Sequence, residues 1–154
     1  MGLIAELGSG PVGLDTAIFI YFIEEHPRYL STVLPVFTAI DGGELTAATS
    51  ALTLLETIVV PYRSNDSALA ERYEALLTRS RGLQLVQLGL PLLRAAALIR
   101  AILNVKTPDA LQLAAALSAG CTSFLTNDRK LSDPGGLRVL QLADYLPEDP
   151  EPTG

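Results

Sequence analysis

Short apolar runs alternate with longer amphipathic stretches along this sequence, and this alternation constrains its fold more than any other feature. The runs and the turn residues around them predict strands at residues 12–15, 44–48, 83–88, 121–125 and 137–140. Apolar residues at helical spacing predict helices at residues 16–25, 28–40, 51–61, 66–79, 92–103 and 107–119. Strands that are separated by helices form a parallel sheet with helices on both faces. We therefore expect an α/β protein, with a central, mostly parallel sheet flanked by helices in an α/β/α sandwich.

The chain has the size and composition of one compact domain. Its 154 residues are 49% hydrophobic and 18% charged, so most helices and strands must bury at least one face. We place the domain at residues 11–146, after a flexible N-terminal segment, residues 1–10, and before a disordered, acidic and proline-rich tail, residues 147–154. No stretch predicts a membrane span, and no secretory signal is visible.

Charge and cysteine content argue against several classes of protein. A formal net charge of −6 argues against a protein that binds nucleic acid through a broad basic surface. The lone Cys121 cannot form an internal disulfide, and together with the lone His26 it is too little for a zinc site. These features predict a protein of a reducing, cytoplasmic compartment.

Two aspartates follow predicted strands. Asp15 ends the first strand, and Asp128 follows the fourth strand after Thr126 and Asn127. In a parallel α/β sheet the ligand crevice lies beyond the carboxyl ends of the strands, where the strand order reverses. The sequence thus predicts that both carboxylates lie at one edge of the sheet. Each residue can also serve as an ordinary helix cap, and Asp128 would then begin a short helix at residues 129–131.

Two further acids stand on helices that should be buried. Glu56 shares one helical stripe with Leu52 and Leu55, which predicts that its carboxylate faces the interior. Asp109 begins a helix, ALQLAAALSAG, that is apolar nearly all round. Structural explanations exist for both acids. A glutamate at a helix edge can reach water, and an aspartate in a first turn interacts favourably with the helix dipole.

One shared site explains these acids better than four separate structural roles. Clustered carboxylates repel one another unless they are protonated or share a cation. Oxygen ligands without His or Cys favour Mg²⁺ or Mn²⁺. Such an ion polarises a phosphoryl oxygen, generates hydroxide from water and stabilises the leaving oxygen, as phosphodiester hydrolysis requires. The residues therefore predict a metal-dependent nuclease whose catalytic and metal-binding side chains are Asp15, Glu56, Asp109 and Asp128.

The segments around these acids resemble the PIN domain family: GLDTAIFI, LTLLET, KTPDALQLAAAL and FLTNDRKL. The order, spacing and setting of the acids match over roughly residues 12–145. The similarity is greatest to VapC-type toxins of toxin–antitoxin pairs. It implies an endoribonuclease in which Asp15 and Asp109 are the main metal ligands, while Glu56 and Asp128 complete the pocket. It also implies an RNA substrate, a homodimer and an antitoxin protein that blocks the groove.

Residues next to the acids are expected to support them or to bind substrate: Thr16, Thr126, Asn127, Arg129 and Lys130. The acidic net charge is compatible with an RNA substrate, because a bound divalent ion supplies positive charge at the scissile phosphate. Arginines can add to this charge, and we expect a rim of them along one helix: Arg63, Arg72, Arg79 and Arg81.

Two other functions are weighed against the nuclease. One is a non-catalytic PIN-like module that binds RNA or a protein and keeps the acids only as a structural pocket. The other is a phosphoryl-acceptor receiver domain, which also has an acidic Mg²⁺ pocket on a doubly wound sheet. A receiver needs paired acids after the first strand and a lysine after the last. Here Asp15 follows Leu14, and the late strands lack such a lysine.

Overall fold

The computed structural model describes residues 2–147, which contain a sheet of five strands and the helices around it. In chain order the elements are α1 (Leu3–Leu7), β1 (Val12–Leu14), α2 (Thr16–Ile23), α3 (Leu30–Asp41), β2 (Ala47–Ser50), α4 (Leu52–Arg63), α5 (Ser67–Arg79), β3 (Leu83–Val86), α6 (Leu90–Leu103), α7 (Thr107–Ser118), β4 (Ser123–Thr126), β5 (Arg138–Gln141) and the 3-10 helix η1 (Leu142–Tyr145). Apart from Pro147, the tail expected at residues 147–154 lies outside the described residues. No helix in residues 2–147 is long and apolar enough to cross a membrane.

The sheet confirms the predicted fold class. Its strands lie in the order β3-β2-β1-β4-β5, and every neighbouring pair is parallel. The chain moves outward from β1 to β3 and then returns to the other side of β1 with β4, so the strand order reverses between β1 and β4. A receiver-type sheet has the order 2-1-3-4-5 instead, and this topology therefore argues against that alternative.

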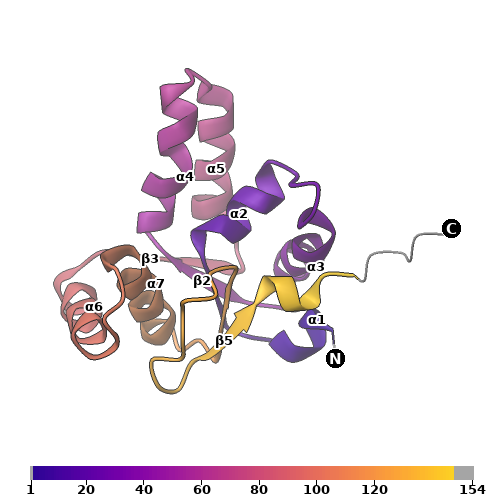
Figure 1. The fold of residues 1–154 in the computed structure, drawn as a ribbon. Helices are drawn as coiled ribbons and strands as arrows, with labels where there is room; N and C mark the ends of the chain where they lie inside the picture. The colour runs from indigo at the N-terminus through magenta and orange to yellow at the C-terminus, as the bar shows by residue number, and fades with distance from the viewer. Residues whose placement is uncertain (1, 148–154) are drawn as a thin grey trace, which may run out of the picture.

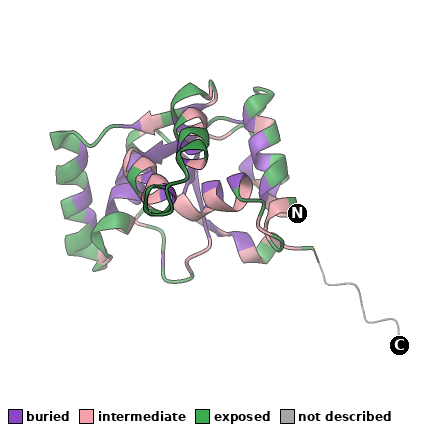
Figure 2. Ribbon diagram, turned by 90° about the horizontal axis from the view of Figure 1, so that it is seen from above, coloured by how far each residue is buried: buried purple, intermediate pink, exposed green. Residues whose placement is uncertain are grey.

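Helices cover both faces of the sheet, because alternate residues of a strand point to opposite sides. Val12 and Leu14 of β1 pack in the core cluster that includes α2 and α3, whereas Phe124 of β4 packs in the cluster that includes α6 and α7. Figure 1 shows these two layers, with the hairpin of α4 and α5 projecting from the body. In Figure 2 the buried residues lie along the sheet and on the inward sides of the helices.

A glycine in β1 allows α7 to lie close to the sheet. A Cβ atom at Gly13 would lie 2.7 Å from the Cβ of Ala116 and 2.6 Å from Cδ2 of Phe124. No larger residue fits between β1 and α7 without displacing one of these side chains. Asp15 follows Gly13 by two residues, and Asp109 lies in the first turn of α7. The close packing at Gly13 therefore helps to set how near these two acids lie.

Three local expectations differ from the structure. The segment at residues 1–10, expected to be flexible, contains α1, whose Leu3 and Leu7 are buried against the core because their spacing places them on one side of the helix. The second strand lies at Ala47–Ser50 rather than at 44–48. No helix follows Asp128, whose Oδ1 instead accepts a hydrogen bond from the backbone N–H of Lys130 at 2.9 Å and closes a turn.

The inward face of α4 is polar, which corrects the predicted apolar stripe. Leu55 is 61% exposed, whereas Thr53 and Thr57 are buried. Threonine can be buried when its hydroxyl is hydrogen-bonded, and the hydroxyl of Thr57 donates to the carbonyl oxygen of Leu54 at 3.1 Å. A hydrophobicity pattern treats these threonines as surface residues, and for this reason it placed the wrong side of α4 inward.

Replacing Gly13 with alanine tests the close packing of α7 on β1. We expect Gly13→Ala to lower the free energy of unfolding by about 1–3 kcal/mol, because the added methyl group overpacks the contact with Ala116 and Phe124. Urea denaturation followed by circular dichroism measures the change. Gly2→Ala is the matched control, since its Cβ would meet no atom within 4 Å. Equal stability of both variants would contradict the packing described here.

Candidate functional site

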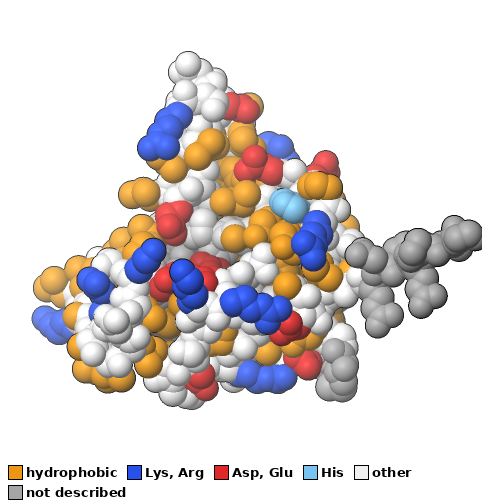
Figure 3. Space-filling view, viewed as in Figure 1, with side chains coloured by type: hydrophobic (Ala, Val, Ile, Leu, Met, Phe, Trp, Pro, Cys, Tyr) orange, Lys and Arg blue, Asp and Glu red, His pale blue; other side chains and the backbone are white. Residues whose placement is uncertain are grey.

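The four acids predicted from the sequence come from four different parts of the chain and lie at one edge of the sheet. Asp15 follows β1, Asp128 follows β4, Glu56 lies on α4 and Asp109 lies in the first turn of α7. Asp15, Glu56 and Asp109 line a cavity of about 350 Å³. The charge of Asp128 raises the pKa of Asp15 and of Asp109. Figure 3 shows acidic side chains at the base of a hollow below the α4–α5 hairpin, with basic side chains along its edge.

Hydrogen bonds hold both oxygens of the Asp15 carboxylate. Oδ1 accepts from the backbone N–H of Thr16 at 2.9 Å, and Oδ2 accepts from the hydroxyl of Thr126 at 2.7 Å. Burial raises the pKa of Asp15, these two hydrogen bonds lower it in part, and the charge of Asp128 raises it further. Asp15 is thus both the N-cap of α2, as its structural explanation requires, and a wall of the cavity.

The pKa of Asp109 is affected by the charges of all three other acids. Burial raises its pKa first, and the negative charges of Asp15, Asp128 and Glu56 raise it further in that order. The nearby Lys106 lowers it. A single half-buried carboxyl therefore experiences repulsion from all three of the other acids.

Glu56 is held by a hydroxyl from a different helix. Its Oε1 accepts a hydrogen bond of 2.7 Å from Thr16, the first residue of α2. The backbone N–H of the same threonine binds Asp15. Thr16, which the sequence placed among the supporting residues, therefore contacts two of the four acids and lines their cavity.

Gln112 is the site residue that the sequence interpretation missed. Its side chain is 2% exposed, lines the acidic cavity, and donates from Nε2 to the hydroxyls of Thr53 at 2.8 Å and Thr16 at 3.2 Å. A signal was present in the sequence. Gln112 is the one polar side chain in ALQLAAAL, and a buried amide in an apolar helix must find hydrogen-bond partners.

The residues around Asp128 behave differently from one another. Thr126 accepts from the backbone N–H of Asp128 at 3.1 Å while it donates to Asp15, so it links the two acids. Asn127 donates to the hydroxyl of Tyr21 at 3.1 Å, which fixes the loop to α2. Both residues anchor the loop that follows β4 and carries Asp128.

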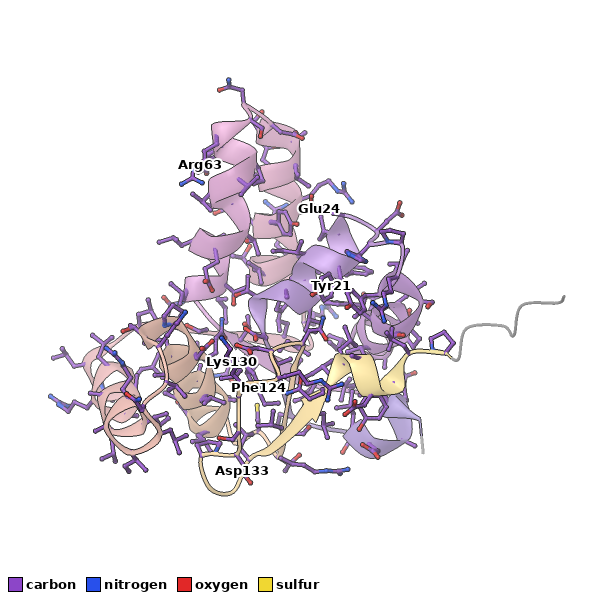
Figure 4. All side chains as sticks on the ribbon, in the orientation of Figure 1. Tyr21, Glu24, Arg63, Phe124, Lys130 and Asp133 are labelled. Atoms are coloured by element: carbon purple, nitrogen blue, oxygen red, sulfur yellow. The ribbon has the colours of Figure 1, made fainter. Side chains whose placement is uncertain are left out.

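In the described part of the chain, the two basic residues after Asp128 differ in their contacts. Arg129 forms an exposed ion pair with Asp144 at 2.6 Å. Lys130 is exposed, and in the view of Figure 4 its label lies below the α4–α5 hairpin. Lys106, which acts on the pKa of Asp109, is a further basic group near the acids.

The predicted arginine rim is wrong for most of its members. Arg72 donates to the carbonyl oxygen of Ile23 at 3.4 Å, and Arg79 and Arg81 line a separate cavity between α3 and α5. Arg63 lies near the free end of the α4–α5 hairpin in Figure 4. The reason is the direction of α5, which returns the chain to the start of β3. The amino ends of the parallel strands lie there, opposite the carboxyl ends where the acids lie.

Comparison with known families identifies the architecture. The sequence matches the PIN domain family over residues 12–137. This chain belongs to the PIN domain family. The family consists of nucleases, so membership supports a hydrolase that acts on nucleic acids. A search of curated proteins gave no significant match.

Solved structures of similar fold include several toxin–antitoxin proteins. This PIN domain is similar to VapBC2 from Rickettsia felis bound to a promoter DNA fragment, with a TM-score of 0.66 and 17% identity over 84% of this chain and 97% of that one. DNA-bound VapBC from Salmonella typhimurium gives 0.60 and 23% over 86% and 98%. VapC20 from Mycobacterium tuberculosis, a Sarcin-Ricin loop cleaving toxin, gives 0.57 and 15% over 73% and 86%. At these identities the likeness concerns the fold.

The donors of the acidic pocket suit Mg²⁺ or Mn²⁺, since all are oxygens. Within residues 2–147, no three His, Cys, Asp or Glu side chains are grouped closely enough to hold one ion by themselves. Magnesium in nucleotide-handling enzymes usually takes one or two carboxylates directly and keeps several waters. An ion held by one or two of the acids that line the cavity would need no third protein carboxylate.

Neutralising Asp109 should stabilise this PIN domain when no metal is present. The folded-state pKa of Asp109 lies above its ordinary value of 3.8, so its contribution to stability is present below that value and is lost as the pH rises through the folded pKa. At pH 7 without metal the charge is therefore unfavourable, and Asp109→Asn removes it. We expect a melting temperature a few degrees higher in EDTA, together with loss of the stabilisation that Mg²⁺ gives the wild type.

Differential scanning fluorimetry in EDTA and in MgCl₂ measures both effects. Asp41→Asn is the matched control, because Asp41 is an exposed acid at the end of α3. A lower melting temperature of Asp109→Asn in EDTA would refute the repulsion described for this residue.

Proposed function

We propose that this PIN domain is a Mg²⁺- or Mn²⁺-dependent endoribonuclease that hydrolyses phosphodiester bonds of RNA in the cytoplasm. Its catalytic and metal-binding residues in this proposal are Asp15, Glu56, Asp109 and Asp128. The observation that carries the proposal is that Asp15, Glu56 and Asp109, from three separate elements, line one cavity, in which burial and then the charges of the other acids raise the pKa of Asp109. A bound cation removes the repulsion in such a cluster without protonation of its members. Membership of a nuclease family supports the same conclusion.

A bound divalent ion would supply positive charge at the scissile phosphate and a water molecule of lowered pKa. Asp15 and Asp109 are its proposed main ligands. Hydrogen bonds from Thr16 and Thr126 keep Asp15 from rotating. Glu56 is fixed through Oε1, while its Oε2 has no hydrogen-bond partner in the described part of the chain. Groups that are oriented before the substrate arrives need no reorganisation during the reaction.

The proposed activity is tested by incubating the purified chain with structured RNAs in MgCl₂ or MnCl₂. We expect cleavage by the wild type, none in EDTA, and a rate at least about 100-fold lower for Asp15→Asn and for Asp109→Asn, the effect typical of removing an electrostatic stabiliser from an active site. Asp41→Asn should cleave like the wild type. If the wild type and both site variants cut RNA equally, the site assignment is wrong. If none of them cuts RNA, the non-catalytic module is the better description.

We further propose that this chain is the toxin of a toxin–antitoxin pair and forms a homodimer. Support for an antitoxin comes from similar structures that are described as VapBC and toxin–antitoxin complexes. Support for the homodimer comes from α6, where Leu90, Leu98 and Ile102 are 66%, 62% and 69% exposed. Leu98 and Ile102 are four residues apart and so lie side by side on α6, and contiguous exposed apolar surface is typical of protein interfaces.

Sedimentation of the chain alone tests the homodimer, and co-expression followed by sedimentation and an RNA cleavage assay tests the antitoxin. The chain alone should sediment at twice its monomer mass, and Leu98→Glu should shift it to the monomer. Co-expression with the product of a small open reading frame next to the gene should give a larger complex that no longer cleaves RNA. A monomeric wild type would remove the homodimer, and the absence of both complex and inhibition would remove the antitoxin.

A further inference from the structure

We propose that Gln112 is a positioning residue of the acidic pocket, whose amide fixes the hydroxyl of Thr16 so that this hydroxyl donates to Glu56. This inference rests on the proposed nuclease function. It adds to the proposed site a buried residue that is not one of the four acids. Its basis is a network of hydrogen bonds in which the direction of each bond can be deduced from its neighbours.

The orientation of the Gln112 amide is settled by a backbone group. The N–H of Ser50, which can only donate, lies 3.2 Å from Oε1 of Gln112. This atom must therefore be the amide oxygen. The amide nitrogen then points to the other side, where its two hydrogens reach the hydroxyl oxygens of Thr53 at 2.8 Å and Thr16 at 3.2 Å.

The directions of the threonine hydroxyls follow from this orientation, because each hydroxyl has one proton. The carbonyl oxygen of Leu14, at 2.9 Å from the Thr49 hydroxyl, and the amide oxygen of Gln112, at 3.3 Å, can only accept, so the one proton of Thr49 is directed to these two oxygens, mainly to the nearer one. In the 2.7 Å contact between Thr49 and Thr53, the donor is consequently Thr53. The proton of Thr53 is thus committed and does not point to Thr16.

The remaining hydroxyl, that of Thr16, receives a hydrogen bond from Gln112 and keeps its own proton for Glu56, at 2.7 Å. Without the amide, Thr16 has a second choice, because the hydroxyl oxygen of Thr53 lies only 3.3 Å away. Gln112 takes one of the two acceptor positions of the Thr53 hydroxyl and itself donates to Thr16, so that the Thr16 proton is directed to the carboxylate of Glu56. The same helix, α7, therefore carries one acid of the pocket, Asp109, and the residue that orients another acid on α4.

A double-mutant cycle between Gln112 and Thr16 tests this role. Gln112→Met keeps the side-chain length and removes the amide, and Thr16→Val keeps the shape and removes the hydroxyl. The readouts are the Mn²⁺ dissociation constant by isothermal titration calorimetry, and kcat and KM for RNA cleavage. We expect each variant to weaken Mn²⁺ binding and to lower kcat by about 10- to 100-fold, with little change in KM, as for other residues that orient metal ligands.

The decisive result is the double variant. If Gln112 acts through Thr16, the double variant should be no worse than Thr16→Val alone, and Thr16→Ser, which keeps the hydroxyl, should recover most of the wild-type values. Thr57→Val is the control for a merely structural effect. Thr57 is buried on α4 beside Glu56, yet it bonds only to a backbone carbonyl of its own helix.

The outcomes separate this inference from the proposed function. Suppose that the wild type cleaves RNA. If the losses of the two single variants then multiply in the double variant, or if Gln112→Met binds Mn²⁺ as tightly as the wild type does, the positioning role is overturned and the nuclease stands. A wild type that binds Mn²⁺ without cleaving RNA would overturn the nuclease, while the cycle on Mn²⁺ affinity still decides the role of Gln112. A wild type that binds no Mn²⁺ would overturn both.

Discussion

Repulsion among half-buried carboxylates is the constraint on which the rest of this PIN domain depends. Burial and the negative charges of Asp15, Asp128 and Glu56 raise the pKa of Asp109, and burial strengthens the repulsion between these charges. Such a cluster opposes folding at neutral pH, so the surrounding structure must compensate for it. The compensation is of two kinds: hydrogen bonds from threonines that fix individual carboxylates, and, in the function we propose, a divalent cation that neutralises the cluster as a whole.

The fold brings the acids together through the two places where it is most tightly constrained. The strand order reverses between β1 and β4, which places the residues that follow both strands at one edge. Gly13 lets α7 lie directly on β1, so that the start of this helix reaches the same edge. The buried network of Gln112, Thr16, Thr49 and Thr53 then joins α7, α2, β2 and α4 beneath the pocket. The same contacts that pack the core therefore also fix the positions of the acids.

Features that depend on local pattern could be predicted from the sequence, and features that depend on side-chain hydrogen bonds could not. The alternation of strands and helices predicted the parallel sheet, and the strand ends predicted where Asp15 would lie. The position of Glu56 was predicted for the wrong reason, because α4 buries threonines rather than the stripe that contains Leu55. The ion pair of Arg129 with Asp144 joins residues that no periodicity connects. The sequence marks Gln112 as a polar residue in an apolar helix, but it does not show its hydrogen-bond partners, which come from three other elements of the chain.

The central claim is that these four carboxylates form one pocket for a divalent cation. The most direct measurement is a crystal structure of the chain grown or soaked with MnCl₂, with diffraction data collected at a wavelength where manganese scatters anomalously. We predict an anomalous peak in the cavity between the side chains of Asp15 and Asp109. A structure with no peak in that cavity at saturating Mn²⁺, or with peaks only elsewhere on the surface, would contradict it.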